Sequence, residues 1–213
     1  MYEFPRLFTK KFLTIGLGLA LIIISGCSST SKYPQIPEDQ RVLPQDYTYI
    51  IGPGDGMEIF VWGNPELTMG VTVRPDGKIT TRLVEEIPAS GKTPIELARD
   101  IEVAYSEYVK NPVVTVIVSG FVGIPPQQVR VIGEAMSPLN IPFRKHMTLL
   151  DLMIAVGGLT PYANGNKAVL IRNYDGKQKT FNILIDNLIK DGDISANMSM
   201  LPGDIVIIPE SWF

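Results

Sequence analysis

Glycine and proline divide the apolar sequence into short runs, which favours short strands and short helices joined by tight turns. The chain of 213 residues includes 19 glycines and 17 prolines. Hydrophobic residues still make up 45 % of the chain, which is typical of a folded globular protein rather than a disordered one. A chain of this length suits one or two modest domains.

Residues 1–26 have the pattern of a secretion signal. Arg6, Lys10 and Lys11 form a positively charged start, and an apolar run follows at residues 12–24. A membrane-spanning helix needs about 20 apolar residues, so this run is short for a transmembrane segment. It has the length of a signal-peptide core, and we exclude it from the predicted fold.

Cys27 follows the signal directly and is the only cysteine, so no disulfide can form within one subunit. Ile24-Ser25-Gly26-Cys27 resembles the lipobox of bacterial lipoprotein signal peptides. The resemblance implies cleavage between Gly26 and Cys27 and acylation (palmitate) at Cys27. Ser28 at the next position implies sorting to the outer membrane. The alternatives are an ordinary signal with a chance cysteine, or an uncleaved anchor.

Residues 27–44 are expected to form a lipidated, flexible leash. This stretch is polar, contains several prolines and lacks apolar periodicity. Without residues 1–26 the chain loses three of its 19 basic residues and one of its 22 acidic residues, which leaves a net charge of −5. No basic stripe could follow a phosphate backbone, so the composition argues against binding nucleic acid.

Residues 45–120 are predicted to form a first small domain. Gly52-Pro53-Gly54-Asp55 and Arg74-Pro75-Asp76-Gly77 are turn signals between apolar runs. Thr93 and Glu96 form a capping box that predicts the start of a helix. The predicted elements are a strand at 57–62, a hairpin of 71–74 with 78–81, a helix from 94 to about 109, and a strand at 113–118.

Residues 126–209 are predicted to form a second small domain. Thr148 and Asp151 form another capping box, and Gly157-Gly158 is expected to stop the helix that it opens. Pro202-Gly203-Asp204 is a turn into the last strand. The predicted elements are strands at 128–132, 167–172, 179–185 and 205–208, and a helix at 149–156.

The two regions together predict the α+β class, with two small domains that contain mixed or antiparallel sheets. Pro125-Pro126 marks the boundary between the domains, which we place at residues 119–126. Residues 210–213 remain as a C-terminal tip.

Patterns of catalytic and metal-binding residues are weak. His146 is the only histidine, and with a lipidated Cys27 no Cys/His nucleophile pair or metal cluster can be built. Glu85 and Glu86 would point to opposite faces of a strand, which makes them a poor acid–base pair. The sequence therefore predicts a protein that is not an enzyme and that has no cofactor and no metal.

Several short motifs follow one another along the first domain. They are Tyr49-Ile50-Ile51-Gly52-Pro53-Gly54-Asp55, Val61-Trp62-Gly63-Asn64-Pro65-Glu66-Leu67, Val73-Arg74-Pro75-Asp76-Gly77-Lys78-Ile79, Gly91-Lys92-Thr93, and Asn111-Pro112-Val113-Val114-Thr115-Val116. In this order they resemble the polysaccharide export domain of Wza-type outer-membrane exporters. Gly56 and Arg82 depart from the family pattern, which puts local strand packing in doubt.

Motifs of the second domain continue the resemblance. They are Val129-Arg130-Val131-Ile132-Gly133-Glu134, Ala155-Val156-Gly157-Gly158-Leu159-Thr160, and Leu201-Pro202-Gly203-Asp204. This region resembles the soluble-ligand-binding β-grasp (SLBB) domain of the same proteins. The ending Ile208-Pro209-Glu210-Ser211-Trp212-Phe213 resembles the subgroup found with exosortase-type exopolysaccharide gene clusters.

The family resemblance implies a function in exopolysaccharide or capsule export. Subunits of the family form a homo-oligomeric ring in the periplasm, octameric in the best-known members, which conducts polysaccharide towards and across the outer membrane. The resemblance also implies an inner-membrane chain-length or copolymerase protein as a partner. The alternative functions are a periplasmic ligand-binding lipoprotein and a scaffold lipoprotein of the same machinery that does not conduct polymer.

The family motifs also have structural interpretations. Gly52, Gly54 and Gly77 are expected at turns that need positive φ. Asp55 and Asp76 are expected to cap their own turns. Arg74 could line a channel, but we favour pairing with a carboxylate.

The C-terminus gives one further expectation. Only residues 210–213 follow the last predicted strand, whereas a spanning helix needs about 20 residues and a tilted β-strand about 9–11. The pore in the outer membrane is therefore expected to be a separate β-barrel protein. Trp212 and Phe213 would lie at the rim of the periplasmic conduit, where they touch the lipid interface or dock on a partner, or else they pack under the last strand.

Overall fold

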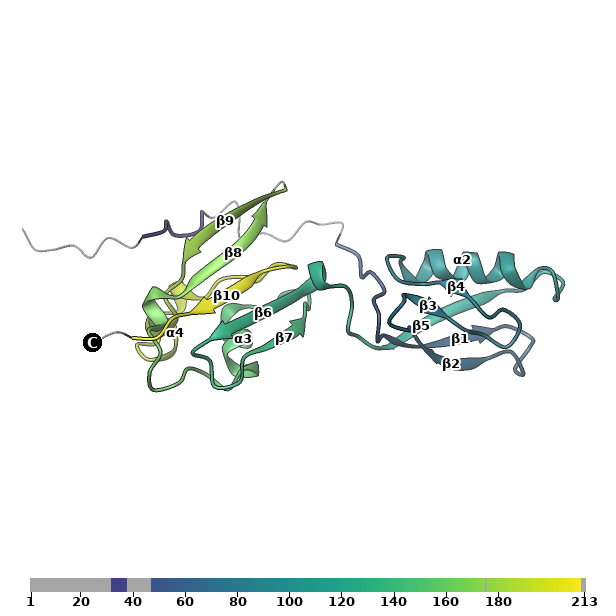
Figure 1. Ribbon diagram of the computed structural model, residues 1–213, viewed down its shortest axis with the longest axis horizontal. Helices are drawn as coiled ribbons and strands as arrows, with labels where there is room; N and C mark the ends of the chain where they lie inside the picture. The colour runs from purple at the N-terminus through teal and green to yellow at the C-terminus, as the bar shows by residue number, and fades with distance from the viewer. Residues whose placement is uncertain (1–31, 38–46, 175, 212–213) are drawn as a thin grey trace, which may run out of the picture. The chain divides into compact units, whose positions relative to one another are not determined.

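A computed structural model of the chain describes residues 32–37, 47–174 and 176–211 (Figure 1). Over these residues it contains two small sheet domains with a few short helices, so the predicted α+β class is confirmed. No helix within the described ranges is long and apolar enough to cross a membrane.

The first domain is built on a three-stranded antiparallel sheet in the order β2-β1-β5. Its elements are β1 (Gly56–Val61), β2 (Met69–Thr72), β3 (Lys78–Ile79), β4 (Ile87–Pro88), α2 (Pro94–Tyr105) and β5 (Val114–Gly120). Met57, Ile59 and Val61 alternate with exposed residues along β1 and are buried. The sheet therefore has one core face. Figure 1 shows α2 alongside these strands.

Helix α2 begins as its capping box predicts. The Thr93 hydroxyl accepts a hydrogen bond from the Glu96 amide, and the Glu96 carboxylate accepts one from the Thr93 amide. Pro94 occupies the first helical turn, where a missing N–H is tolerated. The buried side of the helix consists of Leu97, Ala98, Ile101 and Tyr105. The helix ends at Tyr105, four residues before the predicted end, and a turn leads to Asn111, whose φ is 52°.

The predicted hairpin of residues 71–74 with 78–81 forms only at its turn, where the Arg74 amide donates to the Lys78 carbonyl at 2.9 Å. A tight turn is present, because the Gly77 amide donates to the Arg74 carbonyl. The flanking strands, however, pair elsewhere: β2 pairs with β1, and β3 pairs with β4. Strand β2 pairs with β1 at four positions, and β1 has a buried face. This pairing is more stable than a local hairpin of two-residue strands.

The second domain has a five-stranded sheet in the order β7-β6-β10-β8-β9. Strands β10 and β6 are parallel and the other pairs are antiparallel, so the sheet is mixed. Its elements are β6 (Gln128–Gly133), β7 (Leu139–Pro142), α3 (Leu149–Ala155), β8 (Val169–Tyr174), β9 (Lys177–Asn182), α4 (Ile185–Ile189) and β10 (Ile205–Ile208). The sequence reasoning missed β7 and α4, which are short elements with little periodicity.

Side chains from strands and helices together form the core of the second domain. Its members include Val129, Val131, Leu149, Leu152, Leu170, Ile183, Val206 and Ile208. Helix α3 starts at the predicted capping box of Thr148 and Asp151. It stops where predicted, since Gly157 and Gly158 adopt φ values of 78° and 88° that other residues rarely adopt.

Part of the predicted leash packs against the second domain, so the expectation of a wholly flexible leash is wrong for residues 32–37. Ile36 is only 5 % exposed and belongs to the core of that domain. The Pro34 carbonyl accepts a hydrogen bond of 2.8 Å from the Asn182 amide at the end of β9. The remainder of the leash, residues 27–31 and 38–44, lies outside the described residues.

Candidate functional site

Two turns of similar composition each hold a carboxylate inside the protein. Gly52-Pro53-Gly54-Asp55 precedes β1, and Pro202-Gly203-Asp204 precedes β10. Asp55 and Asp204 are both 0 % exposed. A buried carboxylate requires hydrogen-bond donors or an opposite charge, so the groups around each aspartate show what the turn does.

Neutral donors from two segments of the chain surround Asp55. The Gly52 amide and the Tyr49 hydroxyl donate to Oδ2 at 2.9 and 2.7 Å. The amides of Val122 and Gly123 donate to Oδ1 at 2.7 and 2.8 Å. Burial, together with the hydrogen bond to Asp55, raises the pKa of Tyr49 well above its usual value. Asp55 therefore caps its own turn and also fixes the chain just after β5.

Glycine at position 52 is required by close packing. A Cβ atom there would lie 2.1 Å from the Gly123 carbonyl oxygen, far inside van der Waals contact. Gly54 needs glycine for a different reason, because its φ of 92° is strained for any other residue. Pro53 stands between them and restricts the backbone of the turn.

Asp204 is held by a charged partner. Arg172 on β8 donates from Nε to Oδ1 at 2.9 Å and from Nη2 to Oδ2 at 2.6 Å, and it is itself 1 % exposed. The Leu201 amide donates to Oδ2 at 2.7 Å. Burial raises the pKa of the Asp204 carboxyl, and the hydrogen bonds from Arg172 oppose that change. Sequence reasoning missed Arg172, because only the register of β8 against β10 brings it to the turn.

The turn at Pro202-Gly203-Asp204 also contacts residues that follow the first domain. The Gly203 amide donates to the Gln128 carbonyl at 3.2 Å, and the Arg130 amide donates to the Asp204 carbonyl at 2.9 Å. A Cβ atom on Gly203 would lie 3.0 Å from the Pro126 carbonyl oxygen, and its φ is 84°. The turn thus holds the start of β6.

Residues 121–128, which we call the joint, therefore contact both turns. Gln127 adds to these contacts, since its Oε1 accepts from the Ile50 amide at 3.0 Å and its Nε2 donates to the Thr48 carbonyl at 2.9 Å. The Gln128 side chain donates to the Val122 carbonyl at 3.1 Å. The turn residues that the sequence singled out thus fix the backbone of the joint, a structural role.

The Arg74-Pro75-Asp76-Gly77 turn is at the surface. Arg74 forms an ion pair with Asp76, and a Glu86 carboxylate oxygen lies 3.9 Å away. The Lys78 amide donates to Asp76 Oδ1 at 3.3 Å, and Gly77 has a φ of 81°. In the structure Arg74 thus contacts carboxylates of its own domain.

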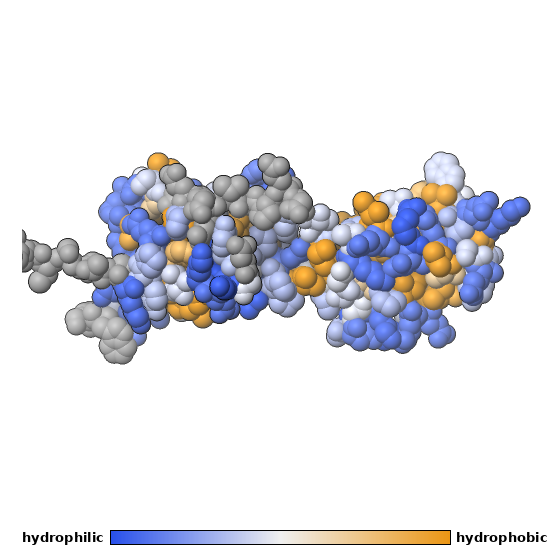
Figure 2. Space-filling model, turned by 90° about the horizontal axis from the view of Figure 1, so that it is seen from above, coloured by the Kyte–Doolittle hydropathy of each residue, from blue (hydrophilic) through white to orange (hydrophobic). Residues whose placement is uncertain are grey.

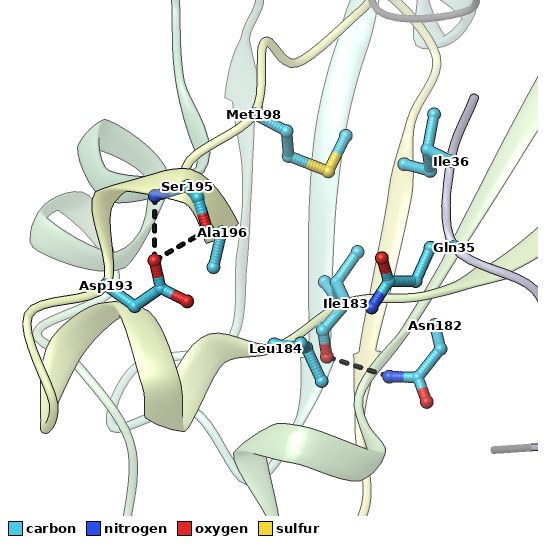
Figure 3. Close-up of a pocket in the computed structure, with 9 residues that line it drawn as sticks. All are labelled: Gln35, Ile36, Asn182, Ile183, Leu184, Asp193, Ser195, Ala196 and Met198. Atoms are coloured by element: carbon cyan, nitrogen blue, oxygen red, sulfur yellow. Dashed lines mark hydrogen bonds between the residues drawn. The ribbon is translucent and has the colours of Figure 1, made fainter. Parts of the chain in front are cut away.

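A hollow beside Ile36 has a volume of about 230 Å³ (Figure 3). Its lining residues are Gln35, Ile36, Asn182, Ile183, Leu184, Asp193, Ser195, Ala196 and Met198. Asp193 accepts hydrogen bonds from the amide and hydroxyl of Ser195, so its carboxylate caps a local turn. The hollow combines an apolar wall with a few polar groups that are already hydrogen-bonded.

Groups with catalytic or metal-binding potential do not cluster in the described part of the chain. No set of three histidine, cysteine or acidic side chains there could hold a metal ion. His146 is exposed and adopts a φ of 68°. Gly26, Cys27, Trp212 and Phe213, which the sequence also singled out, lie outside the described residues.

Comparison with known proteins assigns both domains. Residues 43–119 match the family described as "Polysaccharide biosynthesis/export protein", and residues 127–208 match the SLBB domain. The chain is 28 % identical over 197 residues to the "EPS I polysaccharide export outer membrane protein EpsA" of Ralstonia nicotianae (strain ATCC BAA-1114 / GMI1000). It is 26 % identical over 204 residues to the protein of the same description from Ralstonia solanacearum.

These alignments cover 79 % and 81 % of this chain, but only 49 % and 52 % of the relatives. The chain thus spans about half the length of the curated relatives that it matches. Polysaccharide export proteins are transport components and not enzymes. The two domains, in this order and joined at residues 121–128, place the chain in the family of Wza-type polysaccharide export proteins, with one SLBB domain.

Proposed function

We propose that this protein is a periplasmic component of an exopolysaccharide or capsule export apparatus, anchored by lipid to the outer membrane. Its subunits assemble into a homo-oligomeric ring whose lumen conducts the polymer. An inner-membrane copolymerase delivers the polymer to the ring. The observation that carries this proposal is the match to a polysaccharide export domain followed by an SLBB domain.

Two independent features support this location. The relatives are described as outer membrane proteins. In this chain a signal-like segment ends at Cys27, the single cysteine. Several acyl chains on one residue give a durable anchor, whereas a single chain binds a membrane only marginally.

Exposed apolar side chains on the first domain support assembly with further copies. Phe60 on the outward side of β1 and Trp62 just after that strand have ring centroids 6.4 Å apart, and Trp62 is 71 % exposed. Ile95 and Val103 on α2 are 75 % and 73 % exposed. Seen from above, Figure 2 shows apolar residues interspersed among hydrophilic ones. Burying such residues between symmetric copies would add stability that small separate cores lack.

The anchor is tested by Cys27→Ser. This variant should remain an uncleaved or soluble precursor, should not incorporate radioactive fatty acid, and should abolish polymer secretion in cells. Ser29→Ala, a neighbouring change that keeps the cysteine, serves as the control and should behave as the unmodified protein. Normal fatty-acid labelling of the Cys27→Ser protein would refute the anchor.

The ring is tested by native mass spectrometry and electron microscopy of the solubilised protein. Closed rings with an open lumen are expected. A monomer that binds a small molecule saturably would favour the alternative of a ligand-binding module. A monomer that binds none, but copurifies with the polymerase, would favour a scaffold that does not conduct polymer.

A further inference from the structure

Residues 33–37, which we call the strap, lie against the edge of the second domain. Strand β9 is the last strand of its sheet, so its outer edge has no neighbouring strand among the described residues. The amide of Asn182, at the end of β9, donates to the Pro34 carbonyl of the strap at 2.8 Å. Two residues further on, the Ile36 side chain enters the core and is 5 % exposed.

The surface that receives the strap is held in place by its own hydrogen bonds. The Asn182 side chain donates to the carbonyls of Asn166 and Ile183 at 3.0 and 3.1 Å. These bonds fix the end of β9, where the amide that binds the strap is located. Figure 3 shows Ile36 beside the hollow, with Ile183 and Met198 among the other lining side chains.

The sequence of the strap suits docking. Pro34 and Pro37 flank the sequence Gln35-Ile36. Proline restricts φ, so the strap loses little backbone entropy when it binds in an extended form. Further along the chain Tyr47 packs edge-on against Phe143, just after β7, with ring centroids 5.2 Å apart. Since β7 is the opposite edge of the same sheet, the second domain is contacted at both edges by residues that precede β1.

We propose that the strap is a clamp that shortens the membrane tether and holds the second domain close to the lipid bilayer. This inference rests on the proposed lipid anchor at Cys27. Nine residues separate Cys27 from Ile36, and an extended chain of that length reaches about 32 Å at most. With the strap released, the next contact among the described residues is that of Tyr47, twenty residues from the anchor, and the reach becomes about 70 Å.

The docking step is tested by hydrogen exchange on the lipidated protein in detergent. Ile36→Asp places a charge in the apolar core of the second domain, where Ile36 is buried, and should release the strap. Exchange of the Asn182 amide should then become faster by about tenfold or more, because its acceptor is lost. The matched control is Ser137→Asp, which adds the same charge at an exposed position between β6 and β7, outside the strap and the hollow, and should leave exchange unchanged. Ile36→Ala adds no charge and should show the same effect at smaller amplitude.

The shortening of the tether is tested in vesicles by energy transfer. A reporter cysteine replaces the exposed Gln178 on β9 and carries the donor dye, while acceptor dyes label the lipid headgroups. Ile36→Asp should lower the transfer efficiency relative to Ser137→Asp. Equal efficiencies in both variants, or unchanged exchange at Asn182 in Ile36→Asp and Ile36→Ala, would overturn the clamp.

Failure of the clamp is distinguishable from failure of the proposed function. Polymer secretion by cells reports on export, and exchange at Asn182 reports on the strap without any polymer. If Ile36→Asp changes both exchange and energy transfer while secretion continues, the clamp stands and is dispensable for export. If the unmodified protein does not bind vesicles, the anchor is refuted, and the clamp is refuted with it.

Discussion

The turns at Asp55 and Asp204 each bury a carboxylate. Different groups replace the water that hydrated each carboxylate. Asp55 receives four neutral donors, two from the turn region and two from the joint. Asp204 receives two hydrogen bonds from the Arg172 guanidinium and one from a backbone amide. The donors of Asp55 connect two chain segments, whereas those of Asp204 connect a turn to a sheet strand.

The energetic consequences of the two arrangements differ. In a buried ion pair, the attraction between the two charges offsets only part of the free energy lost when they leave water. Removing one partner, however, leaves the other charge buried alone. Neutral donors leave no buried charge behind when their acceptor is changed. We therefore expect the turn with the ion pair to be the more sensitive to a single substitution.

The largest effect is expected for Asp204→Asn. The change leaves the Arg172 guanidinium buried without a counter-charge, which should lower the free energy of unfolding by about 3–5 kcal/mol. Urea unfolding, monitored by hydrogen exchange in the strands of the second domain, would measure the loss of free energy of unfolding.

A second substitution sharpens this result. Arg172→Met combined with Asp204→Asn removes the unpaired charge, so the double variant should be more stable than Asp204→Asn alone. If the double variant is as unstable as the single one, the ion pair is not the source of the loss.

A smaller effect is expected for Asp55→Asn. An asparagine side chain has only one acceptor oxygen. Its NH₂ group is a donor and would face the N–H or O–H groups that donated to the second carboxylate oxygen, so those hydrogen bonds are lost. The free energy of unfolding should fall by about 2–3 kcal/mol. Hydrogen exchange should become faster at the Val122 and Gly123 amides and stay unchanged in β10. A loss equal to that of Asp204→Asn would remove the distinction between the two turns.

The smallest effect is expected for Tyr49→Phe. This change removes one of four donors to Asp55, from a hydroxyl that is only partly buried, and should cost about 1 kcal/mol. Thermal unfolding would measure the change. The matched control is Tyr108→Phe, since Tyr108 is 61 % exposed and should tolerate the change. A loss as large as that of Asp55→Asn would mean that the tyrosine, rather than the backbone amides, holds the carboxylate.

Local patterns in the sequence correctly predicted those features that depend on contacts between residues close together in the chain. Both capping boxes and the helix stop at Gly157-Gly158 depend on residues within a few positions of one another. Hydrogen bonds of this kind form in the same way wherever the segment is placed, so short motifs indicate them. The ordered motifs likewise indicated the family, and the matches to both domains confirm that identification.

Only the tertiary structure decided the contacts between residues far apart in sequence. The pairing of β2 with β1, the position of Arg172 against Asp204 and the burial of Ile36 all depend on register and on surfaces that no local window contains. The sequence by itself determined the turns, the caps and the family. The fold determined which groups face each buried carboxylate, because hydrogen bonds and packing between distant segments exist only once the sheets have formed.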